Sequence, residues 1–146
     1  MSITVRQGSL EEVVAVVATI NEFVRKETVH TLNERLQGKK SLVLVALQDE
    51  QLLGFKIGYQ LSSDEFYSWF GGVSPQARGY GVAQRLLEEQ EAWALEQGYQ
   101  RLRVKSRNQF PSMLRLLLRN NYLIDNYEKM ENIAESRIHF VKQPSK

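Results

Sequence analysis

A glycine-rich turn between a predicted strand and a predicted helix has the residue types and spacing that most directly indicate chemistry. The turn reads Arg78-Gly79-Tyr80-Gly81-Val82-Ala83 and follows a strand that ends at Val73. The first backbone N–H groups of a helix lack internal partners and carry the positive end of the helix dipole, so they attract an anionic group. Gly79 and Gly81 let the backbone bend sharply and approach such a group closely. The turn therefore predicts a phosphate-binding loop.

The spacing of the turn distinguishes it from the two commoner phosphate loops. A Walker A loop would end in Gly-Lys-Ser/Thr, whereas Val82-Ala83 follow Gly81, and the Rossmann pattern GxGxxG does not fit either. The turn instead resembles the acetyl-CoA loop of the GNAT family of N-acetyltransferases, which has Arg/Gln-x-x-Gly-x-Gly/Ala after a strand ending in valine. A plain tight connection between strand and helix is the alternative. The resemblance implies that Arg78 adds positive charge and that the CoA pyrophosphate binds the backbone amides of Arg78, Gly79, Tyr80, Gly81, Val82 and Ala83.

Two consecutive glycines mark the strand that leads into this turn. Gly71 and Gly72 lie in a strand otherwise rich in aromatic residues, where glycine weakens the strand and often indicates a bulge or the close approach of a ligand. In the GNAT family the corresponding strand is bulged and diverges from its neighbour. The resemblance therefore implies that Gly71, Gly72 and Val73 pair with the pantetheine arm of acetyl-CoA. A bulge that only twists the sheet is the alternative.

Acetyl transfer to an amine requires the amine to lose its proton, because a free lysine-type amine has a pKa of ~10.4. A nearby carboxylate takes that proton directly or through water, and a strand N–H opened by a bulge stabilises charge on the carbonyl oxygen. Glu65 is the predicted base. It lies thirteen residues before Arg78, which resembles the position of the catalytic glutamate in the histone-acetylating branch of the family. The alternative is that Glu65, next to Asp64, is a solvated carboxylate of the turn and has no catalytic role.

The last predicted helix departs from the GNAT pattern. Many members have Asn-x-x-Ala-x-x-x-Tyr-x-x-x-Gly-Phe, in which the tyrosine protonates the leaving thiolate. Aligning Asn121-Tyr122 on the closing Gly-Phe puts Phe110 at the asparagine and Leu117 at the tyrosine, so the usual general acid is absent. A thiol has a pKa of ~8.5, so water could protonate the thiolate. Tyr67, beside the predicted acceptor pocket, Tyr80 and Tyr127 are all candidate substitutes, and the sequence does not select among them. Asn108 is predicted to contact the cofactor from the end of a strand.

Four basic residues alternate along one predicted strand. Arg101, Arg103, Lys105 and Arg107 share one face, while the aliphatic residues between them occupy the other. They form either a solvated face, with their stems packed on apolar surface, or a contact to the CoA 3′-phosphate.

Composition limits the function without selecting it. The 146 residues carry a net charge of only +2, which argues against nucleic acid or a membrane surface as a partner. There is no cysteine, which excludes disulfides and thiolate metal sites. The two histidines, His30 and His139, lie far apart in the sequence, so no metal is expected. No apolar run reaches the ~20 residues of a membrane span and no export signal is evident, so a cytoplasmic location is expected.

Hydrophobic periodicity predicts a single domain over residues 1–146 with the order βααβββαβαββ. Ser9 begins a capping box ahead of a helix whose apolar stripe runs from Val13 to Val24. This is the order of the α/β GNAT acyl-CoA N-acyltransferase fold, a mixed central sheet flanked by helices. After the first strand, at Ile3 and Val5, the remaining elements are predicted as a helix at 31–37, strands at 41–48, 52–61 and 66–73, a helix from 82 to Gly98, a strand at 99–106, a helix at 111–119, and strands at 122–130 and 136–141.

These features together predict an N-acetyltransferase that uses acetyl-CoA and acts by direct attack of a primary amine in a ternary complex. A small molecule or a peptide could supply the amine, and the resemblance is compatible with a homodimer. Two alternatives stay open: a module that binds acetyl-CoA with little or no catalysis, and acyl transfer to a hydroxyl acceptor. The residues around the acceptor pocket carry no motif that names the acceptor.

Overall fold

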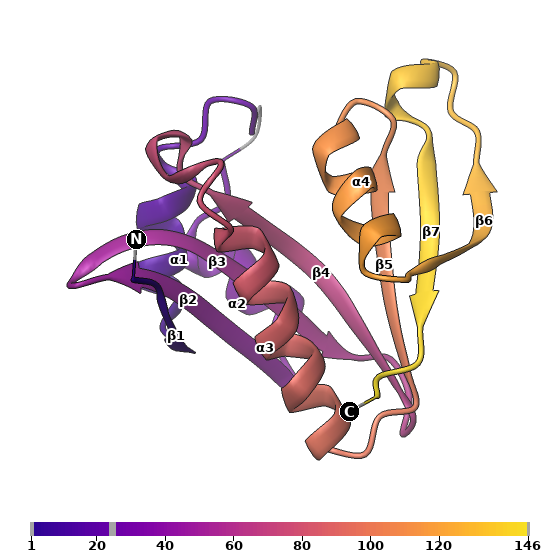
Figure 1. The fold of residues 1–146 in the computed structure, drawn as a ribbon, viewed down its shortest axis with the longest axis horizontal. Helices are drawn as coiled ribbons and strands as arrows, with labels where there is room; N and C mark the ends of the chain where they lie inside the picture. The colour runs from indigo at the N-terminus through magenta and orange to yellow at the C-terminus, as the bar shows by residue number, and fades with distance from the viewer. Residues whose placement is uncertain (1, 24–25, 146) are drawn as a thin grey trace.

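A seven-stranded mixed sheet forms the centre of the molecule (Figure 1). The structure is a computed structural model that describes residues 2–23 and 26–145. The strands lie in the order β1-β2-β3-β4-β5-β7-β6, and every neighbouring pair is antiparallel except β4 and β5, which run parallel. The strands are β1 Thr4–Gln7, β2 Ser41–Gln48, β3 Gln51–Gln60, β4 Glu65–Val73, β5 Arg101–Arg107, β6 Leu123–Glu128 and β7 Arg137–Lys142.

Four α-helices cover the two faces of the sheet. They are α1 Leu10–Val17, α2 Val29–Leu36, α3 Val82–Glu96 and α4 Pro111–Arg119, with short 3-10 turns at Pro75–Ala77 and Ile133–Glu135. Figure 1 shows α3 across the arm of the sheet that holds β2 and β3, and α4 against the arm that holds β5 and β7. The predicted order βααβββαβαββ is confirmed, and the architecture is a mixed α/β sheet flanked by helices.

Local signals set the helix starts. Ser9 caps α1 through the predicted capping box, in which its side chain accepts from the Glu12 N–H and the Glu12 carboxylate accepts from the Ser9 N–H. Thr28 caps α2 in the same way, so that helix starts two residues before the predicted position. The α1 helix ends at Val17, although Ile20 is still buried, and the predicted stripe residue Val24 lies outside the described residues. The element bounds predicted beyond residue 30 differ from those observed by at most two residues.

The core consists of two clusters, one on each face of the sheet. Phe66, Leu102 and Leu117 belong to the cluster under α3 and α4, whereas Val13, Phe55 and Ile57 belong to the cluster under α1 and α2. Because successive side chains of a strand point to opposite faces, each residue of β4 and β5 can be assigned to one of these two faces. Within the described part of the chain, no helix has both the length and the apolar character needed to cross a membrane.

β4 and β5 separate halfway along their length. Their pairing runs from Glu65 opposite Arg101 to Ser68 opposite Val104, and no later residue of β4 pairs with β5. Figure 1 shows the two strands close together at one end and splayed at the other. The bulge of β4 lies at Trp69, because Ser68 pairs with Gly58 while Phe70 pairs with the preceding residue of β3. The prediction of a bulge in this strand is confirmed, but its position at Gly71 and Gly72 is wrong, since both glycines pair regularly with β3.

Candidate functional site

The glycine-rich turn joins the splayed end of β4 to α3. Gly79 has a φ of +84° and Gly81, the residue that caps α3, has a φ of +82°. Residues that carry a Cβ rarely adopt this left-handed backbone conformation, so glycine is favoured at both positions. A Cβ built at either residue would meet no atom within 4 Å. The turn therefore presents open backbone in front of the helix start.

The N–H groups of this turn lack acceptors within the described protein. Arg78 N–H bonds weakly to the Pro75 carbonyl at 3.4 Å, and the next bonded amide is that of Arg85, which donates to the Gly81 carbonyl. Between them, no backbone or side-chain acceptor among the described residues takes the N–H groups of Gly79, Tyr80, Gly81, Val82, Ala83 and Gln84. Six consecutive free donors at the positive end of a 15-residue helix are suited to an anion.

Arg78 contributes less free charge to the turn than its position suggests. Its guanidinium Nη1 lies 2.6 Å from Glu22 Oε2, and its Nε donates to the Val73 carbonyl. The ion pair lowers the pKa of Glu22, mainly through this hydrogen bond. Arg78 thus connects the turn to the segment after α1, and the backbone is the main source of positive potential in the turn.

The splayed half of β4 offers an unpaired strand edge beside β5. Gly71, Gly72 and Val73 pair with β3 on one side only. A Cβ at Gly72 would lie 2.7 Å from Ile20 Cδ1 and near two aromatic rings, so this glycine lets the segment after α1 pack on the sheet. At Gly71 the nearest atom would be 3.3 Å away, followed by Lys56 Cγ at 3.7 Å. The two glycines therefore have different local roles.

Three buried polar side chains lie on the α3 side of the sheet. Ser68 Oγ and both amide atoms of Gln90 have no hydrogen-bond partner among the described residues, and Gln90 is completely buried. Lys56 is only 7% exposed and has neither an ion pair nor a hydrogen bond within the described chain. Burial lowers the pKa of the Lys56 ammonium to about 8, and the Glu91 carboxylate partly opposes this change. Buried polar groups without partners are rare, so each of them requires an explanation.

Lys56 and Gln90 were not predicted as site residues, although each stands in a pattern that marks its position as buried. Gln90 follows the predicted inward residues Leu86 and Leu87 at four and three positions, which is a core position of α3. Lys56 stands in a strand whose other residues are mostly buried. A charged or amide side chain at a position that periodicity assigns to the core is the signal that could have found them.

Glu65, the predicted base, is held by two arginines at the closed end of β4 and β5. Its Oε2 lies 2.9 Å from Arg101 Nε and 2.7 Å from Arg103 Nε. Hydrogen bonds from Arg101 and Arg103 lower the pKa of Glu65. A carboxylate held in this way is a weaker proton acceptor, which opposes the role of base. The contact also joins β4 to β5 where their pairing begins.

Tyr67 lies on the same face as Glu65, next to the point where the strands separate. Its ring meets the Tyr59 ring edge-on, with 5.4 Å between the centroids, and Lys105 Nζ lies 5.8 Å from its centroid. Burial raises the pKa of Tyr67, so its hydroxyl stays protonated. Tyr67 and Lys105 both line a cavity of about 190 Å³.

This cavity is assembled from five elements on the sheet face opposite α3. Arg35 comes from α2, Tyr59 from β3, Tyr67 from β4, and His139 from β7. The remaining lining residues are Leu61, Arg103, Val104, Lys105 and Phe140. The sequence analysis named Tyr67 as a site residue and placed the basic residues of β5 on one face. It could not associate Arg35 or His139 with them, because no local pattern connects these positions.

Around α4, the tyrosine expected from the family pattern is absent and the side chain of Asn108 already has a hydrogen-bond partner. Leu117 is completely buried in the core under α4, so no hydroxyl is present where a tyrosine was expected. Tyr122 is buried and donates to the Glu91 carboxylate at 2.7 Å, and burial raises its pKa. The Asn108 side chain donates to the Ile133 carbonyl, which holds the turn before β7. Its predicted contact with a cofactor stays a prediction.

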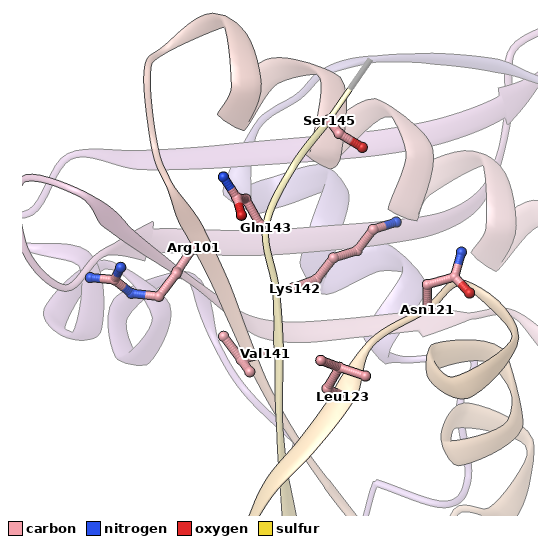
Figure 2. Close-up of a pocket in the computed structure, with 7 residues that line it drawn as sticks. All are labelled: Arg101, Asn121, Leu123, Val141, Lys142, Gln143 and Ser145. Atoms are coloured by element: carbon pink, nitrogen blue, oxygen red, sulfur yellow. The ribbon is translucent and has the colours of Figure 1, made fainter.

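A second cavity, of about 420 Å³, lies at the other end of β5 (Figure 2). Its lining includes Arg101, at the first residue of β5, and Lys142, at the last residue of β7. Figure 2 shows the Arg101 guanidinium pointing to one side of the strands, whereas Lys142 and Asn121 point to the other. These polar groups do not converge, and the cavity lies away from the divergence of β4 and β5. Within residues 2–23 and 26–145, no cluster of three or more metal-ligating side chains is present.

Comparison with known proteins places this geometry in a family. The model of the "Acetyltransferase (GNAT) family" matches residues 12–122, about three quarters of the chain. No curated protein sequence matches the chain.

Solved structures share the fold at low sequence identity. Ard1 from Thermoplasma volcanium is 15% identical with a TM-score of 0.85, and all of both chains is covered. The ribosomal-protein-S18-alanine N-acetyltransferase from Escherichia coli is 16% identical with a TM-score of 0.84, covering 99% of this chain and 96% of the other. A GNAT family acetyltransferase from Elizabethkingia anophelis with acetyl-CoA bound is 14% identical with a TM-score of 0.74, covering 97% of each chain. At these identities the likeness establishes the fold.

Proposed function

The chain belongs to the GNAT family of acetyl-CoA-dependent acetyltransferases, and from that premise we propose that it acetylates a primary amine by direct attack in a ternary complex. Acetyl-CoA supplies an acetyl thioester. The amine nitrogen forms a bond to the acetyl carbon, the carbon–sulfur bond breaks, and CoA leaves as a thiolate. The amine proton passes to water, and the thiolate takes a proton from water or from a neighbouring hydroxyl.

The six free N–H groups from Gly79 to Gln84 are the observation that carries this proposal. They suit the CoA pyrophosphate, because consecutive amides at a helix start offer several donors and a favourable dipole to one anion. Arg78 would add a weaker attraction, since Glu22 already neutralises part of its charge. The positive φ of Gly79 and Gly81 provides the backbone shape that exposes these donors.

The unpaired edge of β4 and the buried polar side chains would hold the pantetheine arm. That arm contains two amides, which can pair with the strand edge at Gly71, Gly72 and Val73. Ser68 and Gln90, which lack partners in the described protein, are further polar groups on the α3 side of this region. A polar ligand there would explain why the fold tolerates them.

The acceptor amine would enter from the opposite face, through the cavity at Tyr67. Arginine and lysine side chains around that cavity favour the neutral amine over the ammonium ion, because a nearby positive charge lowers the pKa of an amine. This electrostatic effect assists deprotonation by water without a dedicated carboxylate. Tyr67 keeps its proton and is our candidate for the hydroxyl that protonates the thiolate. The predicted role of Glu65 as base would require its two arginine contacts to open.

A pair of glycine variants tests the cofactor site. Gly81 and Gly98 flank α3, both have positive φ (+82° and +87°), and a Cβ at either would meet no atom within 4 Å. Gly81→Glu and Gly98→Glu therefore introduce similar backbone strain and the same charge. We expect Gly81→Glu to weaken acetyl-CoA binding at least about a hundredfold, because it removes the turn shape and places a carboxylate beside the phosphates. Gly98→Glu should stay within about threefold of the parent protein.

Isothermal calorimetry measures the affinities, and circular dichroism with thermal melting checks that both variants fold. A second assay follows release of the CoA thiol in the presence of a panel of amines. Binding without thiol release from any amine would contradict the transferase proposal. Equal loss of affinity in the two variants would contradict the assignment of the turn.

A further inference from the structure

The cavity at Tyr67 has a charge pattern that indicates the kind of acceptor. Among its lining residues are four basic side chains, those of Arg35, Arg103, Lys105 and His139, and no carboxylate lines it. Two of these four already contact carboxylates: Arg103 lies 2.7 Å from both Glu65 and Asp125, and His139 Nε2 lies 3.2 Å from Glu128 Oε1. Arg35 and Lys105 form no ion pair with any described carboxylate.

The Arg35 guanidinium is oriented without using its terminal nitrogens. Its Nε donates to the Tyr59 hydroxyl at 3.1 Å, and its central carbon lies 4.9 Å from the Trp69 ring centroid. Neither terminal nitrogen has an acceptor among the described residues. A guanidinium held by stacking and by one hydrogen bond keeps a planar pair of donors for a carboxylate or phosphate.

Lys105 approaches the cavity from the opposite side, next to the cofactor gap. It is the first residue of β5 after the last pair with β4, which joins Val104 and Ser68. Its ammonium lies 5.8 Å from the Tyr67 ring and has no acceptor within the described chain. Arg35 and Lys105 therefore present two uncompensated positive charges beside the place where β4 and β5 separate.

We propose that the acceptor is a small amine that also carries a carboxylate, and that Arg35 and Lys105 bind this carboxylate; this inference rests on the proposed function. A simple amine is a cation at neutral pH, and two uncompensated cations would repel it. A carboxylate on the acceptor reverses this repulsion and directs the molecule into the cavity. The volume of about 190 Å³ suits a compact group at the carboxylate-bearing end of the acceptor.

Matched acceptors test the proposal. The panel contains ω-amino carboxylates of two to six carbons, the corresponding primary amides, the unsubstituted alkylamines, and aminoalkyl phosphonates. The dipeptides Gly-Glu-amide and Gly-Gln-amide test whether the carboxylate can come from a peptide side chain. Thiol release at saturating acetyl-CoA gives kcat/KM for each. We expect carboxylates to exceed their amides at least about tenfold, because a hydrogen bond to a charged group is lost with the amide.

Two variants test whether Arg35 and Lys105 cause the preference for a carboxylate. Arg35→Gln and Lys105→Met should each raise KM for the best carboxylate about tenfold or more, whereas KM for its amide should not rise, because removing one cation weakens the repulsion of a positively charged amine. Lys40→Met is the matched control, because Lys40 also lies over aromatic rings, Trp93 and Tyr99, but outside the cavity lining. Calorimetric affinity for acetyl-CoA should be unchanged in all three variants.

The outcomes separate this inference from the proposed function. The inference is overturned, and the cofactor assignment is unaffected, if acetyl-CoA binds and amines without a carboxylate react as efficiently as amino carboxylates. The same holds if acetyl-CoA binds and no amino carboxylate is acetylated. If phosphonates exceed carboxylates, the predicted anion is wrong. If acetyl-CoA itself does not bind and no thiol is released, the proposed function fails instead.

Discussion

The two halves of β4 differ in how they contact their surroundings: one uses its side chains and the other leaves its backbone edge unpaired. From Glu65 to Ser68 the strand pairs on both sides, and its side chains make the contacts, including the ion pairs of Glu65 and the cavity wall at Tyr67. Beyond Trp69 the strand pairs on one side only, and glycine replaces large side chains at Gly71 and Gly72. The bulge at Trp69 lies at the boundary between them.

This difference indicates how the fold divides recognition between backbone and side chains. Where a ligand is bound by N–H and carbonyl groups, side chains only obstruct it, so small residues and positive φ angles are suited to the site. Where side chains bind the ligand, they come from strands and helices that meet only in the folded protein. The site that we propose for the cofactor is of the first kind, and the cavity that we propose for the acceptor is of the second kind.

The largest expected effect concerns Lys56, which lies on the α3 face opposite Gly71. Its folded-state pKa of about 8 is below its ordinary value of 10.5. Between these pH values the unfolded chain binds more protons, so the folded protein gains stability as the pH rises. Relative to Lys56→Met, the free energy of unfolding of the parent should increase by up to about 3 kcal/mol from pH 7 to 10.5.

Urea unfolding at several pH values, extrapolated to water, measures this difference. Lys40→Met, which removes an exposed lysine, should show no comparable change. A flat difference for Lys56→Met would mean that the Lys56 ammonium is well solvated, and that the α3 side of the splayed half is less enclosed than the structure indicates.

A smaller effect separates the two glycines of the splayed half. Gly72→Ala places a Cβ 2.7 Å from Ile20 Cδ1 and should lower the free energy of unfolding by about 1–3 kcal/mol. Gly71→Ala meets its nearest atom at 3.3 Å and should cost less than about 1 kcal/mol. Urea unfolding measures both values. Equal costs would mean that the close approach of Ile20 does not distinguish the two positions, and would contradict the proposed contrast between them.

The smallest expected effect concerns Glu65 in the paired half. We expect Glu65→Gln to lower Tm by about 2–4 °C at pH 7 and to change kcat less than about threefold, because the carboxylate joins β4 to β5. The lowered pKa of Glu65 stabilises the folded protein above the ordinary carboxylate pKa, and this contribution is lost as the pH falls. The variant should therefore lose less stability than the parent on acidification.

Steady-state thiol release and thermal melting between pH 4 and pH 8 measure these effects. A fall in kcat of a hundredfold or more, with Tm unchanged, would support the predicted role of Glu65 as base. It would also show that the paired half takes part in proton transfer in addition to holding the sheet together.

The parts of the fold that were predicted correctly are those with local causes. The capping box at Ser9, the periodicity of α3 and the glycine turn at Gly79 and Gly81 each depend on neighbouring residues. The position of the β4 bulge was not predictable in the same way. It depends on the register between β3 and β4, and Gly72 has a separate packing explanation that involves Ile20.

The amino-acid sequence by itself therefore determined the order of the elements and the backbone site for an anion, because helix periodicity, capping and positive φ angles are properties of short segments. Only the tertiary structure decided which side chains line the cavity at Tyr67, which we propose binds the acceptor. Arg35, Tyr67 and Lys105 are separated by 32 and 38 residues and meet because β4 lies parallel to β5 with α2 across the same face. It also placed Glu65 between two arginines, since cross-strand neighbours follow from register and not from sequence distance.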